Sequence, residues 1–145
     1  MANYTLRPGT QEFKTFTENA RQQSIRWAKR MMSTPPSNWL ILDTETTGLD
    51  EDAEIIQIGV TDGAGKTLMD NLLCSPFGNI PAAATAVHHI TNEMVKHAPA
   101  FLERYKELSI LAAGKFVVIY NKAYDMRLID QSIARFSSYP LLVPL

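Results

Sequence analysis

The 145-residue sequence has few of the features that would place a protein outside the cell or in a membrane. It contains a single cysteine, Cys74, so no disulfide can form within the chain, which is compatible with a reducing cytoplasm. No stretch approaches the roughly 18 consecutive apolar residues of a membrane span, and the N-terminus lacks the apolar core of a secretory signal. We therefore expect a cytoplasmic protein without a membrane partner.

The charges of the chain nearly cancel, but they are unevenly distributed. The sequence has 14 Lys and Arg against 15 Asp and Glu, for a net charge of −1. Residues 1–33 carry six basic side chains and two acidic ones, whereas residues 34–145 carry eight and thirteen. The basic segment could help to hold a polyanion, or it could be an ordinary solvated helix face.

Apolar spacing and breaker residues predict two parts. Residues 11–32 have the pattern of a helix, with five apolar residues near one face: Phe13, Phe16, Ala20, Trp27 and Met31. The Pro-containing stretch 33–37 ends it. We expect residues 1–37 to form an N-terminal helical extension with a Pro-rich linker, packed through Phe16 and Trp27 on a single domain at residues 38–145.

The order of elements within residues 38–145 predicts an α/β domain. Strands are expected at 38–45, 54–61 and 66–74, with a turn at 62–65 joining the last two. A helical pair follows, with Thr91 as a helix N-cap and a second helix between Pro99 and Gly114. The apolar run Phe116–Tyr120 predicts a strand buried on both faces. A final helix at 123–136 should turn four apolar side chains inward: Met126, Ile129, Ile133 and Phe136.

Two acidic residues lie at the end of the first expected strand, directly after its apolar run. Side chains alternate along a strand, so Asp43 and Glu45 point the same way, about 7 Å apart. Like charges beside an apolar run repel each other and resist desolvation, so the pair favours a bound cation. Hard oxygen ligands suit Mg²⁺ or Mn²⁺. The plainer alternative is a strand end with two solvated acids.

Four stretches resemble the DnaQ-like (DEDDh-type) 3′–5′ exonuclease superfamily, which includes ribonuclease T and the proofreading subunit of bacterial DNA polymerase III. Ile-Leu-Asp-Thr-Glu-Thr-Thr-Gly-Leu at 41–49 resembles its first motif, and Tyr-Asn-Lys-Ala-Tyr-Asp at 120–125 its second. Glu-Ile-Ile-Gln-Ile-Gly at 54–59 resembles its second strand, and Val-His-His-Ile-Thr at 87–91 its Val-His-Gly-Ile-Thr. The four occur in family order.

The resemblance implies a ribonuclease H-like fold. This is a mixed sheet, a three-strand meander followed by a helix–strand–helix segment, flanked by helices and here incomplete at the C-terminus. Its first and fourth strands are neighbours, which would bring Asp125 to Asp43 and Glu45. These three residues are the implied catalytic and metal-binding set.

The resemblance also implies a two-ion Mg²⁺ or Mn²⁺ mechanism of phosphodiester hydrolysis. Asp43 would bridge the ions, Glu45 would hold one, and Asp125 would hold the other, through water. The implied substrate-binding residues frame or approach the terminal nucleotide: Thr46, Thr47, Gly48, Leu49, His88 and Tyr124. His89 stands where the family has Gly, and Tyr124 where it has Phe.

The family's third motif, His-x-x-x-x-Asp, which supplies the general base and a fourth carboxylate, has no counterpart after Asp125. The sequence is therefore expected to be a C-terminally truncated exonuclease domain, inactive or weak alone.

Three interpretations of the chain remain open. The first is a 3′–5′ exonuclease that takes a single-stranded 3′ end of DNA or RNA, with a polymerase or other replication or repair protein as a possible partner. The second is a non-catalytic module that binds nucleic acid or a partner. The third is a chain that folds only with a partner supplying the missing C-terminal layer.

Overall fold

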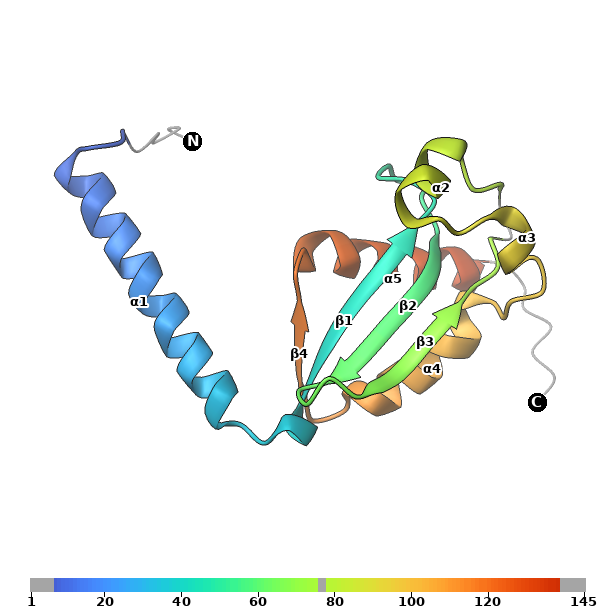
Figure 1. Ribbon diagram of the computed structural model, residues 1–145. Coiled ribbons are helices and arrows are strands. Elements are labelled where there is room, and N and C mark those ends of the chain that lie inside the picture. The colour runs from blue at the N-terminus through green and yellow to red at the C-terminus, as the bar shows by residue number, and fades with distance from the viewer. Residues whose placement is uncertain (1–6, 76–77, 139–145) are drawn as a thin grey trace. The chain divides into compact units, whose positions relative to one another are not determined.

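The computed structural model describes residues 7–75 and 78–138, and the chain divides into two units, residues 1–35 and 36–145 (Figure 1). The first unit contains helix α1 (Gln11–Ser33). The helix begins where the Thr10 hydroxyl accepts a hydrogen bond of 3.2 Å from the Phe13 N–H. The expected packing of this helix on the second unit stays a prediction. In the described ranges, no helix is both long and apolar enough to cross a membrane.

The second unit is built on a four-stranded sheet. Its strands are β1 (Trp39–Thr46), β2 (Ile55–Asp62), β3 (Thr67–Leu72) and β4 (Phe116–Ile119), with a 3₁₀ turn η1 (Pro36–Asn38) before the first. The strand order is β3-β2-β1-β4. β1 pairs antiparallel with β2 and parallel with β4, and β2 pairs antiparallel with β3. The predicted meander and the neighbouring first and fourth strands are both confirmed.

The turn between β2 and β3 is closed by one side chain and two glycines. Oδ1 of Asp62 accepts hydrogen bonds of 2.9 Å from the N–H groups of Ala64 and Lys66. Gly65 has a φ of +83°, which favours glycine. Gly63 lies against the Trp39 indole, and a Cβ at this position would overlap the ring. The two glycines therefore serve different purposes, one for backbone freedom and one for space.

Two helices, α4 (Phe101–Ala112) and α5 (Lys122–Ser138), cover the same face of the sheet (Figure 1). The core lies between them and the strands. Apolar side chains from every layer meet there, including Leu40, Leu42, Ile58, Val60, Phe101, Leu108, Leu128 and Ile129. This packing fixes which face of β1 points toward the helices and which points away from them.

A smaller apolar cluster holds helices α2 (Ala82–His88) and α3 (Asn92–Val95). It consists of Ile56, Ile80, Ile90 and Val95. Thr91 caps α3 by accepting a hydrogen bond of 3.3 Å from the Met94 N–H, as predicted. The Asn92 carboxamide accepts a hydrogen bond of 2.8 Å from the Ile80 N–H and so ties the two ends of this segment together.

Two predictions about burial are wrong. β4 is the edge strand of the described sheet and is not buried on both faces, because only β1 pairs with it. Phe116 and Val117 are accordingly 44% and 39% exposed, and Tyr120 is fully exposed. On α5, Ile129 is buried as predicted, but Met126 is 37% exposed. The side chain of Phe136 lies outside the described residues.

Candidate functional site

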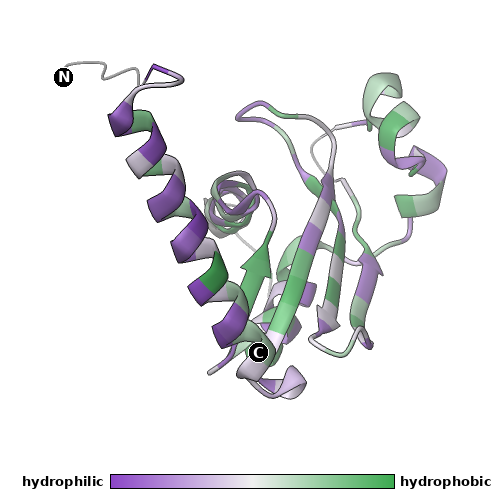
Figure 2. Cartoon of the chain, turned by 60° about the vertical axis from the view of Figure 1, so that its left-hand side comes forward, coloured by the Kyte–Doolittle hydropathy of each residue, from purple (hydrophilic) through white to green (hydrophobic). Residues whose placement is uncertain are grey.

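The acidic pair of β1 lies on the face of the sheet away from α4 and α5. Leu40 and Leu42 are buried toward the helices, so the alternation of the strand places Asp43 and Glu45 on the opposite face. Asp43 is exposed and Glu45 is half-buried. They line an open hollow of about 300 Å³ whose walls also include Gln57, Gly59 and Asp70. Figure 2 shows the strands of this sheet coloured by hydropathy.

Gly59 opens space beside this pair. It pairs with Asp43 on one side and with Asp70 of β3 on the other, so a position without a side chain separates two carboxylates. Gln57 pairs with Glu45 and donates a hydrogen bond of 2.8 Å to Oδ1 of Asp70. Sequence reasoning missed Gln57 and Asp70, although alternation along β2 and the hairpin register could have placed them on this face.

The third predicted ligand, Asp125, approaches β1 from the helix side. It lies in the first turn of α5, is 3% exposed, and accepts a hydrogen bond of 2.8 Å from the Thr44 hydroxyl. In residues 7–75 and 78–138, no three His, Cys, Asp or Glu side chains are close enough to hold one metal ion. The structure therefore groups Asp43 with Glu45, joins Asp125 to Thr44 between them in sequence, and leaves a three-carboxylate site as a prediction.

The turn after β1 is held by hydroxyl groups. The hydroxyls of Thr46 and Tyr124 lie 2.8 Å apart, and both reach the Gly48 carbonyl, at 2.9 and 2.6 Å. The Thr47 hydroxyl accepts a hydrogen bond of 2.9 Å from the Glu54 N–H. Leu49 is 81% exposed. The Tyr124 hydroxyl, absent from the Phe of the family motif, thus fixes the turn that carries the predicted substrate-binding residues.

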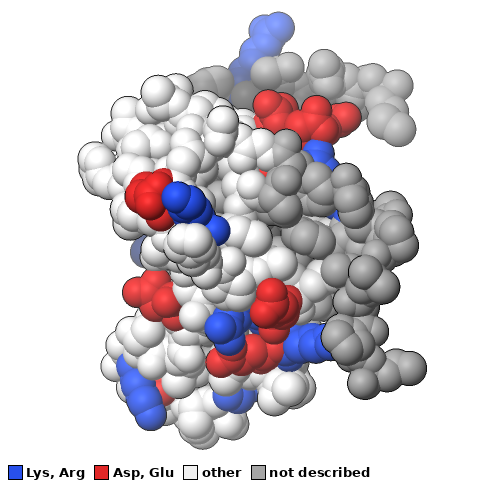
Figure 3. All heavy atoms as spheres, turned by 90° about the vertical axis from the view of Figure 1, so that its right-hand side faces the viewer, with Lys and Arg blue, Asp and Glu red and all other residues white. Residues whose placement is uncertain are grey.

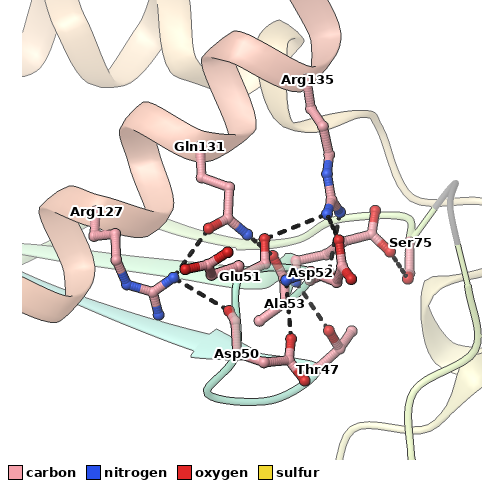
Figure 4. A network of polar contacts seen from close by, with 10 residues as sticks. Thr47, Asp50, Glu51, Asp52, Ala53, Ser75, Arg127, Gln131 and Arg135 are labelled. Atoms are coloured by element: carbon pink, nitrogen blue, oxygen red, sulfur yellow. Dashed lines mark hydrogen bonds and ion pairs between the residues drawn. The ribbon is translucent and has the colours of Figure 1, made fainter.

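Side chains on one side of α5 form hydrogen bonds with the loop at residues 49–53, which follows this turn (Figure 4). Arg127 donates to the Leu49 and Asp50 carbonyls at 3.0 and 3.1 Å. One turn later, Gln131 donates to the Ala53 carbonyl at 2.8 Å. A further turn on, Arg135 donates to the carbonyl and the carboxylate of Asp52, at 3.0 and 2.6 Å. These long-range contacts were not predictable from local sequence patterns.

A buried carboxylate, that of Glu54, follows the loop at residues 49–53 in the sequence. Glu54 is 9% exposed and accepts a hydrogen bond of 2.6 Å from the Ser75 hydroxyl. Burial, and next the negative charge of Glu54, raise the pKa of the Cys74 thiol. Cys74 is thus kept as a neutral thiol and is unsuited to act as a nucleophile at neutral pH.

The predicted histidine, His88, lies at the end of α2. Its Nδ1 accepts a hydrogen bond of 3.0 Å from the Ile90 N–H, so Nε2 carries the proton in the neutral ring. Nε2 is buried without a hydrogen-bond partner among the described residues. His89 caps the helix with a φ of +63°, a left-handed conformation that explains why glycine suits this position in the family motif.

Solved structures share this arrangement of sheet and helices. Exonuclease X in complex with 5′ overhanging duplex DNA is 30% identical, with a TM-score of 0.52 over 62% of this chain and 52% of that one. Escherichia coli Exonuclease I in complex with a dA16 oligonucleotide is 19% identical, with a TM-score of 0.54 over 67% and 23%, and supports the fold alone. The described unit is therefore a ribonuclease H-like α/β domain with carboxylates on its first strand.

Sequence comparisons narrow this class. Residues 40–143 match the Exonuclease family (RNase T). The chain is 47% identical over 93 residues to the uncharacterized exonuclease CP81 of Escherichia phage 186. This alignment covers 64% of this chain and 47% of that protein. It is 32% identical over 108 residues to DNA polymerase III subunit epsilon of Escherichia coli K12, which covers 68% and 44%. The chain belongs to the Exonuclease family and spans less than half the length of these two relatives.

Proposed function

We propose that this chain is part of a metal-dependent 3′–5′ exonuclease that hydrolyses phosphodiester bonds at the 3′ end of DNA or RNA. One observation carries the proposal. In a member of the Exonuclease family, Asp43 and Glu45 lie together on the open face of the sheet and line its hollow. A solvated strand end without function would not explain why Gly59, between Asp43 and Asp70, keeps that hollow free of a side chain.

The donor set suits Mg²⁺ or Mn²⁺. Mg²⁺ is usually held by one or two carboxylates and completed by water and substrate phosphate. Asp43 and Glu45 provide such a pair on one face, and the hollow also holds the oxygen donors Gln57 and Asp70, whereas Met69 in its lining is buried, with 3% exposure. A divalent ion bound there would supply an activated water and stabilise the charge that develops on the phosphate. Asp125 remains the third proposed ligand. To bind a metal ion, its carboxylate must either keep the hydrogen bond from the Thr44 hydroxyl while it coordinates the ion or give up that bond.

The residues after Asp43 and Glu45 are proposed to position the terminal nucleotide. Thr46 and Tyr124 hold the Gly48 carbonyl, so the backbone of this turn is preorganised. Leu49, exposed beside it, can pack against a base. The Nε2–H of His88 is buried without a hydrogen-bond partner among the described residues, so its proposed contact with the strand requires the ring or the residues that cover it to move. Each role uses a group whose position the fold already restricts.

The substrate and partner proposals draw on the relatives. Exonuclease X is seen with duplex DNA that has a 5′ overhang, and subunit epsilon is part of DNA polymerase III. These names support DNA as substrate, with RNA as the second possibility, and a polymerase or other replication or repair protein as partner. A cytoplasmic location stays a prediction.

Metal binding tests the proposal directly, because it does not depend on turnover. Mn²⁺ is titrated into the full chain and followed by electron paramagnetic resonance, with Asp43→Asn as the test variant. Asp130→Asn, at an exposed position on α5, is the matched control. We expect the control to bind as the unmodified chain does and Asp43→Asn to bind at least tenfold more weakly. A chain indifferent to Mn²⁺ would instead support the non-catalytic binding module.

Direction of cleavage needs a second assay. A 5′-labelled single-stranded oligonucleotide incubated with the chain and Mn²⁺ should be shortened slowly and progressively from its 3′ end, and EDTA or Asp43→Asn should stop the reaction. The same products from the Asp43→Asn protein would show that this carboxylate is not catalytic.

A further inference from the structure

Helix α1 is an element that the family match does not include. The match covers residues 40–143, whereas α1 spans Gln11–Ser33 and belongs to the other unit of the chain. The helix has its own N-cap at Thr10 and ends before the two consecutive prolines at 35–36. At 23 residues it is about twice as long as an average helix in a globular protein. A helix of this length outside the second unit, residues 36–145, is a candidate for binding another molecule.

The two sides of α1 differ in character. At 3.6 residues per turn, its aromatic residues fall on one side and its basic residues on the other half of the surface. Phe16 and Trp27 are 57% and 56% exposed. Figure 2 shows hydrophilic residues along most of the length of the helix, with hydrophobic residues recurring between them. The basic half carries five side chains: Lys14, Arg21, Arg26, Lys29 and Arg30.

Positive charge is concentrated toward the C-terminal half of α1. Glu18 forms an ion pair of 3.4 Å with Arg21, and no acidic residue follows it until Asp43. Residues 34–145 are different, with eight basic and thirteen acidic side chains. On the face that Figure 3 shows, red and blue side chains occur in small mixed groups. Along the sequence, the longest run of basic residues with no acidic residue between them therefore lies in α1 and not in residues 34–145.

We propose that the basic side of α1, with Arg26 and Lys29 at its centre, binds the phosphate backbone of single-stranded nucleic acid. Cations along one side of a helix match the regular charge of such a strand and gain affinity from counterion release. The choice of nucleic acid over other polyanions rests on the proposed function. The aromatic side stays available for packing, because it lies on the opposite half of the helix.

The test compares two variants that remove the same charge from the full chain. Arg26→Gln with Lys29→Gln changes the basic side of α1. Lys96→Gln with Lys106→Gln, at exposed positions of the catalytic unit, is the matched control. Binding of a fluorescent 20-nucleotide oligo(dT) is measured by anisotropy in EDTA, which prevents metal-dependent cleavage, over a series of KCl concentrations. Circular dichroism checks that both variants keep the helical content of the unmodified chain.

We expect the α1 variant to bind about five- to twentyfold more weakly at 0.1 M KCl. Its slope of log K against log salt should fall by about 1.4, since each lost phosphate contact on a single strand contributes roughly 0.7. The control should lose less than twofold. Equal losses in the two variants, or none in either, would overturn the proposal.

Two further arms separate the alternatives. Vesicles of phosphatidylserine and phosphatidylcholine that bind the unmodified chain but not the α1 variant, with oligo(dT) binding unaffected, would overturn the proposal in favour of a membrane surface. If Mn²⁺ binding that depends on Asp43 is absent while α1-dependent oligo(dT) binding persists, the exonuclease proposal fails and the α1 proposal stands. Mn²⁺ binding that is lost in Asp43→Asn, without α1-dependent oligo(dT) binding, gives the reverse result.

Discussion

The hydroxyl of Thr44 donates a hydrogen bond of 2.8 Å to Oδ1 of Asp125 and thereby joins β1 to the first turn of α5 across 81 residues of sequence. The bond lies on the helix side of the sheet, whereas Asp43 and Glu45 face the open hollow. Asp125 is almost fully buried, so this hydroxyl is an important donor for its carboxylate. The link therefore fixes the register between the two motif-bearing elements.

Replacing Thr44 by the isosteric valine should destabilise the protein by about 1.5–3 kcal/mol, because a buried carboxylate loses a hydrogen-bond donor. Urea unfolding measures the change. Thr67→Val, at an exposed position of β3, is the control and should cost under about 0.5 kcal/mol. A double-mutant cycle with Asp125→Asn should give a coupling above about 0.5 kcal/mol. Additive effects would mean that the two side chains do not depend on each other.

Arg127→Met should loosen the loop at 49–53, since Arg127 donates to two of its carbonyl groups. We expect amide hydrogen exchange in this loop to become several-fold faster, with a loss of about 1 kcal/mol in global stability. Lys106→Met, on the exposed side of α4, is the control. Unchanged exchange at 49–53 in the Arg127 variant would show that Gln131 and Arg135 hold the loop without it.

His89→Gly should stabilise the protein by about 1 kcal/mol, because a non-glycine residue pays roughly that much in the left-handed conformation. Among the described residues, no other residue except glycine has a positive φ. His97→Gly, without a positive φ, should be neutral or destabilising. Thermal unfolding of the two variants measures the contrast. A loss of stability in both would argue against strain at His89.

Gly63→Ala should cost about 1–3 kcal/mol, since the added Cβ would overlap the Trp39 indole and force it to move. Trp39 should then change its fluorescence emission. Gly78→Ala, where a Cβ meets no atom within 4 Å, is the matched control and should be close to neutral. Equal stability of the two variants would show that the Trp39 ring moves aside freely.

The 145-residue chain should cleave oligonucleotides very slowly, because its three histidines, His88, His89 and His97, all precede Asp125. Without a general base in the position of the family's third motif, the rate should be lower by about 10²–10⁴. A longer chain that carries His-x-x-x-x-Asp after Asp125 should recover this factor in a Mn²⁺-dependent 3′-trimming assay. Rapid trimming by the 145-residue chain would show that His88 or His89 serves as base.

The sequence by itself determined the local features of this protein. Alternation along a strand placed Asp43 and Glu45 on one face, helical spacing identified Ile129 as a buried position, and the family resemblance implied that the first and fourth strands are neighbours. The first two features follow from backbone geometry, which repeats every two residues in a strand and every 3.6 in a helix. This periodicity can be recognised in the sequence without knowing which elements pack against the strand or helix.

The tertiary structure decided what each face meets. An apolar run does not reveal whether a neighbouring strand covers it, so Phe116 and Val117 were expected in the interior but lie at the sheet edge. The partner of Asp125 also depends on how closely α5 approaches β1, which local patterns do not encode. The same holds for the grip of Arg127 on the loop after β1. These contacts join residues about 80 positions apart, and only the packing of the whole core sets their distance.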